Sequence, residues 1–180
     1  MGDLCLSPAQ PEQTTLIIEL VTEISAWLAE RGIQQWPSPP RLEVRQLLAR
    51  EIAAGEVYLA WLTGSPEAVG LLRFEWHDPN LWPDDPDGGG YVHSLLVRPG
   101  YHGRGVGAGM LRWAGEHVRA RGRRYLRLDC VADNWTLRAY YERLGFRCRG
   151  VASHDGYAGA LFELDLDQGT ALGAAPCRSA

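Results

Sequence analysis

A glycine-rich segment between an apolar run and an amphipathic run constrains the fold of this chain more than any other feature. Residues 91–97, YVHSLLV, are rich in aromatic, β-branched and leucine side chains, which favours a strand. The RPG sequence at 98–100 ends that strand, and HGRGVG follows at 102–107 with glycine at every second position. Residues 105–121 repeat apolar side chains at helical spacing. The pattern predicts a strand, a glycine loop and a helix in immediate succession.

Such a loop suits an anion. Glycine has no Cβ, so the backbone can approach a ligand closely, and a helix N-terminus offers unpaired N–H groups and the positive end of its dipole. The nucleotide P-loop is disfavoured because Gly107-Ala108-Gly109 has neither its lysine nor its hydroxyl. The dinucleotide fingerprint is weakened because Met110 stands where a third glycine belongs, although Asp129 lies near the distance of its acidic residue. A glycine turn that only connects strand to helix is the alternative.

Two motifs together resemble the GNAT N-acetyltransferase superfamily. VRPGYHGRGVGAGML at 97–111 is similar to motif A, usually written Gln/Arg-x-x-Gly-x-Gly/Ala, with His102 at the first position. NWTLRAYYERLGF at 134–146 is similar to motif B, in which an Asn precedes a Tyr by seven residues and Leu-Gly-Phe ends the helix. The clear resemblance covers roughly residues 69–146. It implies an α/β acyl-CoA N-acyltransferase fold with a single mixed, mostly antiparallel sheet flanked by helices.

The remaining sequence patterns predict the order of elements that this fold requires. Strands are expected at 4–6, 56–63, 68–76, 91–97, 125–131, 146–151 and 157–166, and helices at 12–31, 42–54, 105–121 and 133–144. Alternation in the fifth strand places Leu126, Leu128 and Cys130 on one face. We expect a single GNAT acetyltransferase domain over residues 1–167 and a disordered tail over 168–180.

Composition argues against several classes of protein. The formal net charge of −4 gives no general attraction to nucleic acid or to an anionic membrane. There is no apolar run of membrane-spanning length, and no basic segment precedes an apolar core as in a secretory signal. Cys5, Cys130, Cys148 and Cys177 are scattered, which argues against a zinc site and fits reduced thiols. We therefore expect a cytoplasmic protein that binds no metal, nucleic acid or membrane.

The resemblance implies acetyl-CoA as the cosubstrate. The backbone of Leu95, Leu96 and Val97 would pair with the pantetheine amides as a sheet edge does, and one of their N–H groups would face the thioester carbonyl. Asn134 would hydrogen-bond the pantetheine arm, with a helix N-cap as the alternative. The site for the pyrophosphate would comprise Gly103, Arg104, Gly105, Val106, Gly107 and Ala108.

The resemblance also assigns a proton donor. Tyr141 corresponds to the tyrosine that protonates the departing CoA thiolate in the family, and it would lie at the end of the CoA site. A phenol suits this role because it can give its proton to a freshly formed thiolate. Leu137 and Leu144 share its helical spacing, so core packing is the alternative. The neighbouring Tyr140 is expected to be structural.

The general base has three candidates in the sequence. Asp129 stands five residues before Asn134, where some members of the family carry a catalytic Glu, and it could instead pair with Arg127. Glu75 ends the third strand, and His93 lies on the central strand with an imidazole suited to base chemistry. A chain of water molecules could replace all three.

We therefore expect an N-acetyltransferase that transfers the acetyl group of acetyl-CoA to a primary amine of a small molecule or protein, by direct attack in a ternary complex. The alternatives are a non-catalytic CoA-binding sensor or regulatory module, and the same fold using another acyl-CoA. The acceptor would be a small-molecule or peptide amine, and the protein a monomer or homodimer. Carboxylates that could attract a cationic amine are Asp78, Asp84, Asp85 and Asp87, with a solvated loop as the alternative. Trp36 resembles the region that roofs the acceptor site in relatives, with core packing as the alternative.

Overall fold

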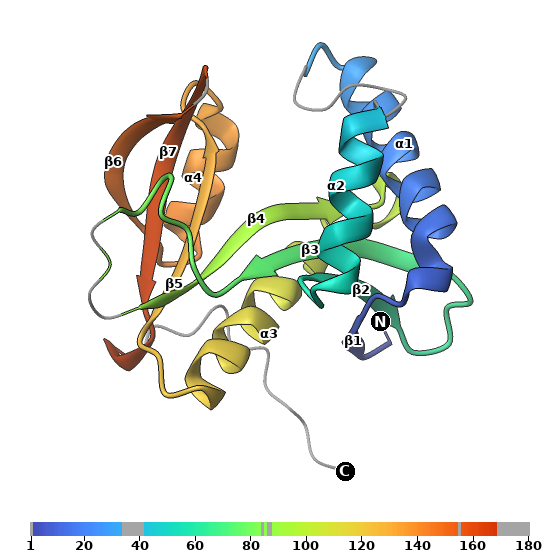
Figure 1. Ribbon diagram of the computed structural model, residues 1–180, viewed down its shortest axis with the longest axis horizontal. Helices are drawn as coiled ribbons and strands as arrows, with labels where there is room; N and C mark the ends of the chain where they lie inside the picture. Colours follow the sequence, from blue (N-terminus) through green and yellow to red (C-terminus); the bar gives the residue numbers. More distant parts are fainter. Residues whose placement is uncertain (1, 34–41, 84, 86–87, 155, 169–180) are drawn as a thin grey trace. The chain divides into compact units, whose positions relative to one another are not determined.

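The computed structural model describes residues 2–33, 42–83, 85, 88–154 and 156–168. Within these residues the strands form one mixed, mostly antiparallel sheet of seven strands in the order β1-β2-β3-β4-β5-β7-β6 (Figure 1). The elements are β1 Leu4–Pro8, η1 Pro11–Gln13, α1 Thr14–Ala29, α2 Leu42–Ala53, β2 Val57–Leu62, β3 Ala68–Glu75, β4 Gly89–Val97, η2 Pro99–Tyr101, α3 Val106–Ala120, β5 Tyr125–Val131, α4 Trp135–Arg143, β6 Arg147–His154, β7 Tyr157–Asp165 and η3 Leu166–Gln168. This confirms the predicted fold class and order of elements. Trp36 and residues 169–180 lie outside the described residues.

β4 begins at Gly89, two residues before the predicted start. The sequence pattern predicted a strand only from Tyr91 onward. Gly89 is part of the strand because β5 packs closely against it. A Cβ at Gly89 would lie 3.2 Å from the carbonyl oxygen of Tyr125 and 3.3 Å from Cδ of Arg127. Gly89 also donates its N–H to Asp85 at 2.9 Å. Contacts from β5 and the loop therefore extend the strand through a residue with no side chain of its own.

Contacts between residues divide the chain into two compact units. The first unit comprises the described residues up to Glu75 together with Val92–Met110, and the second comprises Trp76–Tyr91 and the described residues from Leu111 onward. None of the helices in the described part of the chain combines the length and apolar character of a membrane span.

The core of the first unit lies where α1 and α2, side by side in Figure 1, cover β2 and β3. β1, β2 and β3 pair antiparallel, with Leu59 opposite Leu71. Burial of these apolar side chains is the main driving force for this packing. The fully or nearly fully buried members include Ile17, Leu20, Ile24, Ile52, Val57, Leu59, Ala68 and Leu71.

Gly70 of β3 positions the end of β4 and the start of α3. A Cβ at this position would lie 2.6 Å from the carbonyl oxygen of Leu96 and 3.1 Å from the sulfur of Met110. Only glycine allows the three segments to approach this closely. The glycine loop between β4 and α3 is therefore held at both of its ends by this contact.

The second unit is built on the antiparallel pairs β5–β7 and β6–β7, with Leu128 opposite Phe162. Leu126, Leu128 and Cys130 are buried, as the alternation predicted. Arg127, on the same strand, is also buried.

Arg127 is buried because it is surrounded by partners. Its Nε donates to Glu163 at 2.9 Å, and its Nη1 donates to the hydroxyl of Tyr91 at 2.9 Å and pairs with Asp85. The guanidinium lies 4.6 Å from the ring centroid of Trp82. Burial, followed by the hydrogen bond to Asp85, raises the pKa of Tyr91 to about 12. This cluster fixes the segment before β4 to β5 and β7 within the unit.

Candidate active site

The glycine loop has the backbone geometry of an anion site. Gly109 donates to the carbonyl oxygen of Gly105 at 2.9 Å, so the N–H groups of the first turn of α3 have no acceptor within the helix. Gly103 and Gly105 have φ of 72° and 75°, in the left-handed region. A Cβ at either would meet nothing within 4 Å, so conformation rather than space favours glycine there. The residues predicted to hold the pyrophosphate, 103–108, are thus a turn followed by the first turn of α3.

His102, which stands where motif A usually has Gln or Arg, makes its side-chain contacts with other residues of the protein. Its Nε2 lies 2.7 Å from the carbonyl oxygen of Val97 and donates to it. The ring meets Trp27 of α1 edge-on, with centroids 4.5 Å apart. The imidazole therefore ties the loop to β4 and α1. Arg104 is exposed, with its guanidinium 5.6 Å from the ring centroid of Tyr101.

A second set of contacts, which the sequence analysis missed, fixes the start of the loop. Arg98 donates to Glu23 of α1 at 3.0 Å and to Glu67 at 2.6 Å, and Tyr101 donates to Glu67 at 3.1 Å. Leu95, Leu96 and Val97 end β4 directly before this arginine, and Leu96 is buried. The one feature of the sequence that could have indicated these contacts is the position of Arg98, between a predicted strand and Pro99.

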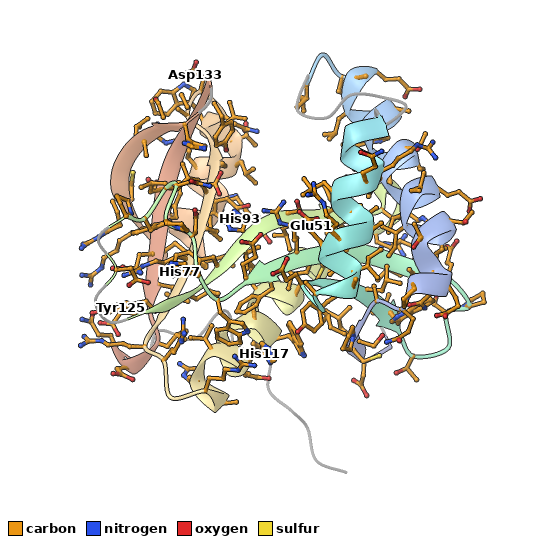
Figure 2. All side chains as sticks on the ribbon, viewed as in Figure 1. Glu51, His77, His93, His117, Tyr125 and Asp133 are labelled. Atoms are coloured by element: carbon orange, nitrogen blue, oxygen red, sulfur yellow. The ribbon has the colours of Figure 1, made fainter. Side chains whose placement is uncertain are left out.

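Glu75 and His93, two of the predicted bases, lie close together in the first unit. Nε2 of His93 is 3.8 Å from Oε2 of Glu75. Arg73 links Glu75 to a further carboxylate, with Nη2 2.7 Å from Oε1 of Glu75 and Nη1 2.9 Å from Oε1 of Glu51. We call Glu51, Arg73, Glu75 and His93 the Glu51–His93 cluster; Figure 2 labels its two end members.

The Glu51–His93 cluster is largely shielded from solvent. Burial raises the pKa of Glu51, while Arg73 opposes the shift. The sequence analysis missed Glu51 and Arg73. Two features of the sequence could have indicated them. Arg73 is a charged residue within the apolar strand AVGLLRFE, and Glu51 follows Leu47 by four residues, which places both on the same side of α2.

The second unit holds Asn134 and Tyr141 on α4. Oδ1 of Asn134 accepts the N–H of Leu137 at 3.0 Å, so Asn134 is the N-cap of the helix. The cap uses the amide oxygen and leaves the NH2 group as a donor for another acceptor.

Tyr141 is 4% exposed, and its ring lies 5.9 Å from that of Phe146 and 5.6 Å from that of Phe162. Burial raises the pKa of Tyr141, so the hydroxyl keeps its proton at neutral pH. Tyr141 therefore has the packing of a core residue, and burial by itself makes its proton harder to release. The pKa of the neighbouring Tyr140 is also raised by burial.

Asp129 accepts a hydrogen bond that was not predicted. The hydroxyl of Tyr157, at the start of β7, donates to Oδ2 of Asp129 at 2.6 Å. Burial, and then this hydrogen bond, raise the pKa of Tyr157. The phenol occupies one oxygen of the carboxylate, while Arg127, the pairing partner considered from the sequence, binds Asp85 and Glu163.

The aspartates of the 78–87 loop are partly used for local structure. Oδ1 of Asp78 accepts the N–H groups of Asn80 and Leu81 at 3.2 and 3.1 Å. Asp85 is held by Tyr91 and Arg127. Asp84 and Asp87 lie outside the described residues. Asp78 and Asp85 are therefore engaged within the protein, which weakens the expectation that this loop attracts a cationic acceptor. Among the described residues, no group of three or more His, Cys, Asp or Glu is placed to hold a metal ion.

Comparison with known proteins gives consistent matches. Residues 21–146 match the model of the acetyltransferase (GNAT) family, and the match ends at the last residue of the second motif. The chain is 32% identical over 163 residues to the uncharacterized N-acetyltransferase YesJ of Bacillus subtilis, covering 88% of each protein. It is similar to the crystal structure of a GNAT-family acetyltransferase from Listeria monocytogenes, with 25% identity, a TM-score of 0.74, and coverage of 90% of this chain and 94% of that chain.

A further similarity is to the PaiA N-acetyltransferase of Thermoplasma acidophilum in complex with coenzyme A, with 18% identity and a TM-score of 0.66. The alignment covers 91% of this chain and 99% of that chain. At 18% identity, this similarity shows that the two proteins share a fold and nothing more.

Proposed function

The chain belongs to the GNAT acetyltransferase family, and on that basis we propose that it transfers the acetyl group of acetyl-CoA to a primary amine by direct attack in a ternary complex. The observation that carries the proposal is the turn at 103–105 followed by N–H groups at the start of α3 that have no acceptor within the helix. Backbone donors at a helix N-terminus favour a pyrophosphate. Residues 105–108 carry no charged side chain.

In the proposed complex, residues 103–108 bind the pyrophosphate of acetyl-CoA, and the backbone of Leu95–Val97 pairs with its pantetheine arm. The exposed Arg104 adds a positive charge beside the loop. The NH2 group of Asn134, which the helix cap does not use, is a donor for a pantetheine carbonyl.

The proposed reaction needs one base and one acid. The amine nitrogen, once deprotonated, attacks the thioester carbonyl, a C–N bond forms and the C–S bond breaks, and the CoA thiolate takes a proton. Tyr141 is the proposed donor because its phenol can give a proton to a freshly formed thiolate. His93 is the proposed acceptor of the amine proton because an imidazole suits base chemistry and its Nε2 lies 3.8 Å from a carboxylate oxygen of Glu75. Asp129 is less suited because Tyr157 occupies one of its oxygens.

A thiol-release assay tests this proposal. Purified protein is incubated with acetyl-CoA and a panel of alkylamines, polyamines, aminoglycosides, amino acids and peptides, and free CoA is measured together with mass spectrometry of the acetylated acceptor. At least one amine should be acetylated, and His93→Gln should slow that reaction far more than Asp129→Asn. A folded protein that binds CoA but acetylates no amine in the panel would instead support the non-catalytic sensor.

A further inference from the structure

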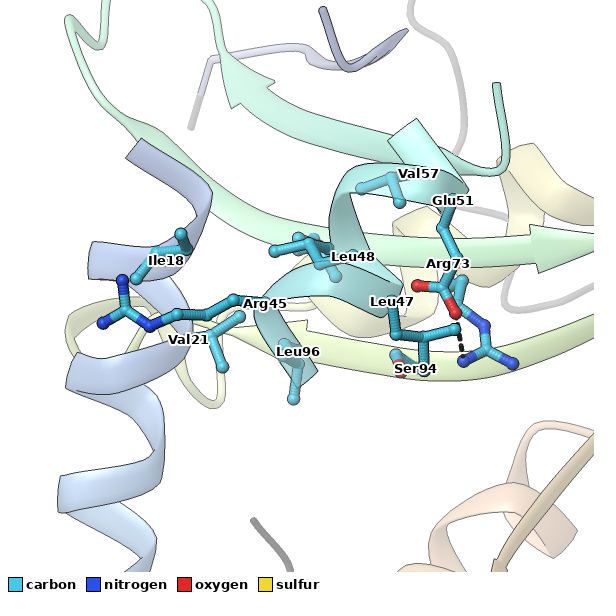
Figure 3. A pocket seen from close by; sticks show the side chains of 11 residues that line it. Ile18, Val21, Arg45, Leu47, Leu48, Glu51, Val57, Arg73, Ser94 and Leu96 are labelled. Carbon is cyan, nitrogen blue, oxygen red and sulfur yellow. Dashed lines mark ion pairs between the residues drawn. The ribbon is translucent and has the colours of Figure 1, made fainter. Parts of the chain in front are cut away.

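A pocket in the first unit has apolar walls and one charged end. It lies between α1 and α2 on one side and β2, β3 and β4 on the other (Figure 3). Its walls are mainly branched apolar side chains, including Leu47, Leu48, Leu71 and Leu96. Glu51, Arg73 and Ser94 lie together at one end in Figure 3, and Arg45 lies at the other. The pocket therefore joins an apolar chamber to the Glu51–His93 cluster.

The charged end has more negative than positive charge. Arg73 uses one terminal nitrogen for Glu51 and the other for Glu75, at 2.9 and 2.7 Å, so one guanidinium serves two carboxylates. With both carboxylates ionised and His93 neutral, the Glu51–His93 cluster sums to −1. Burial raises the pKa of Glu51 because its charged form loses hydration there, and a cation beside it would oppose that shift. One further cation would balance this end of the pocket.

The rest of the pocket disfavours a second cation. An unpaired charge among apolar side chains is costly because it loses its water without gaining a partner. Leu47 is 42% exposed, so the wall that it forms is in contact with solvent. A hydrocarbon chain between the two ends would instead gain from removing apolar surface from water.

We propose that this pocket binds the acceptor of the reaction, and that the acceptor is a monoamine with an apolar body. Its ammonium group lies at Glu51 and Glu75, and its body lies against Leu47, Leu48 and Leu96. Glu51 and Arg73 bring the Glu51–His93 cluster to the pocket, and His93 of that cluster, with its Nε2 3.8 Å from Glu75, accepts the proton of the amine. The catalytic part of this inference rests on the proposed function, whereas the binding part does not.

Calorimetry of amine binding tests the pocket without requiring turnover. Protein saturated with CoA is titrated with n-propylamine, n-hexylamine and hexamethylenediamine. Affinity should rise up to about fourfold for each added methylene that becomes buried. Hexylamine should bind at least tenfold more tightly than the diamine of the same length. Equal affinity for the monoamine and the diamine, or an affinity independent of chain length, would overturn the proposal.

Two pairs of variants locate the site. Glu51→Gln should weaken hexylamine binding at least tenfold, whereas Glu19→Gln, the same change on the exposed side of α1, should leave it unaltered. Leu47→Trp should narrow the pocket and weaken hexylamine more than propylamine, whereas Gln46→Trp, at the exposed neighbouring position of α2, should affect neither. The Leu47 pair decides the question if Glu51→Gln does not fold.

Thiol release with the same amines separates the two proposals. If hexylamine binds as expected but no amine in the panel is acetylated, the pocket stands and the proposed reaction fails. If other amines are acetylated while hexylamine neither binds nor reacts, the reaction stands and the pocket assignment fails.

Discussion

Replacing Arg127 by methionine should strongly destabilise the second unit, in a way that depends on pH. The side chain of Arg127 is 7% exposed and that of Asp85 is 5% exposed, so the change removes a buried cation and leaves the buried carboxylate of Asp85, together with that of Glu163, without it. Removing one partner of a buried ion pair typically costs roughly 3–5 kcal/mol. Methionine fills a similar volume, so little of the loss should come from a cavity.

The pKa of Asp85 determines how the stability lost in Arg127→Met depends on pH. In the wild-type protein, burial would raise the pKa of Asp85, but hydrogen bonds from Tyr91, Arg127 and the N–H of Gly89 lower it overall. A lowered pKa contributes stability above the unfolded pKa, and that stability is lost as the pH falls through the folded pKa. The wild-type protein therefore keeps the contribution of Asp85 at both pH 7 and pH 5.

In the variant, Asp85 can escape burial of its charge by taking up a proton. From a reference pKa of about 3.9, protonation costs about 4 kcal/mol at pH 7 but only about 1.5 kcal/mol at pH 5. The difference in stability between wild type and variant should therefore shrink by roughly 2–3 kcal/mol over this interval.

Urea unfolding followed by tryptophan fluorescence measures this difference, since Trp82 lies over the guanidinium. Arg124→Met is the matched control. Arg124 also makes a paired contact, at 2.9 and 2.6 Å to Asp165, but its side chain is 47% exposed, so solvent can replace the lost partner. Similar losses of stability in the two variants, or the same loss in Arg127→Met at pH 7 and pH 5, would contradict this prediction.

Three further outcomes are expected. Tyr141→Phe should lower kcat roughly 100-fold or more in steady-state assays with CoA affinity unchanged, because only the donated proton is removed, whereas Tyr140→Phe should retain most activity. Gly105→Asp should weaken CoA binding in calorimetry far more than Gly105→Asn, because both residues tolerate left-handed backbone and only the first adds a charge that repels the pyrophosphate; equal losses would place the anion site elsewhere. Tyr157→Phe should change the pH profile of kcat if Asp129 is the base, and a profile that does not move would leave that role to His93.

Local sequence patterns determined the order of elements and the location of the glycine loop. Apolar periodicity depends on neighbours a few residues away, so the alternation of Leu126, Leu128 and Cys130 predicted their burial. Gly103 and Gly105 could be assigned to a turn because glycine adopts left-handed backbone without a steric penalty. The spacing of Asn134 and Tyr141 indicated the family, and the N-cap at Asn134 follows from its place before a helix.

Only the tertiary structure decided which charged groups are partners. Glu51 and Arg73 lie on different elements, and nothing in either local pattern indicates that one guanidinium links Glu51 to Glu75 beside His93. The register of β5 and β7 brings Tyr157 to Asp129. Ion pairs and side-chain hydrogen bonds of this kind depend on the packing and register of strands and helices, which are set by burial over the whole sheet and not by the residues that form the pairs.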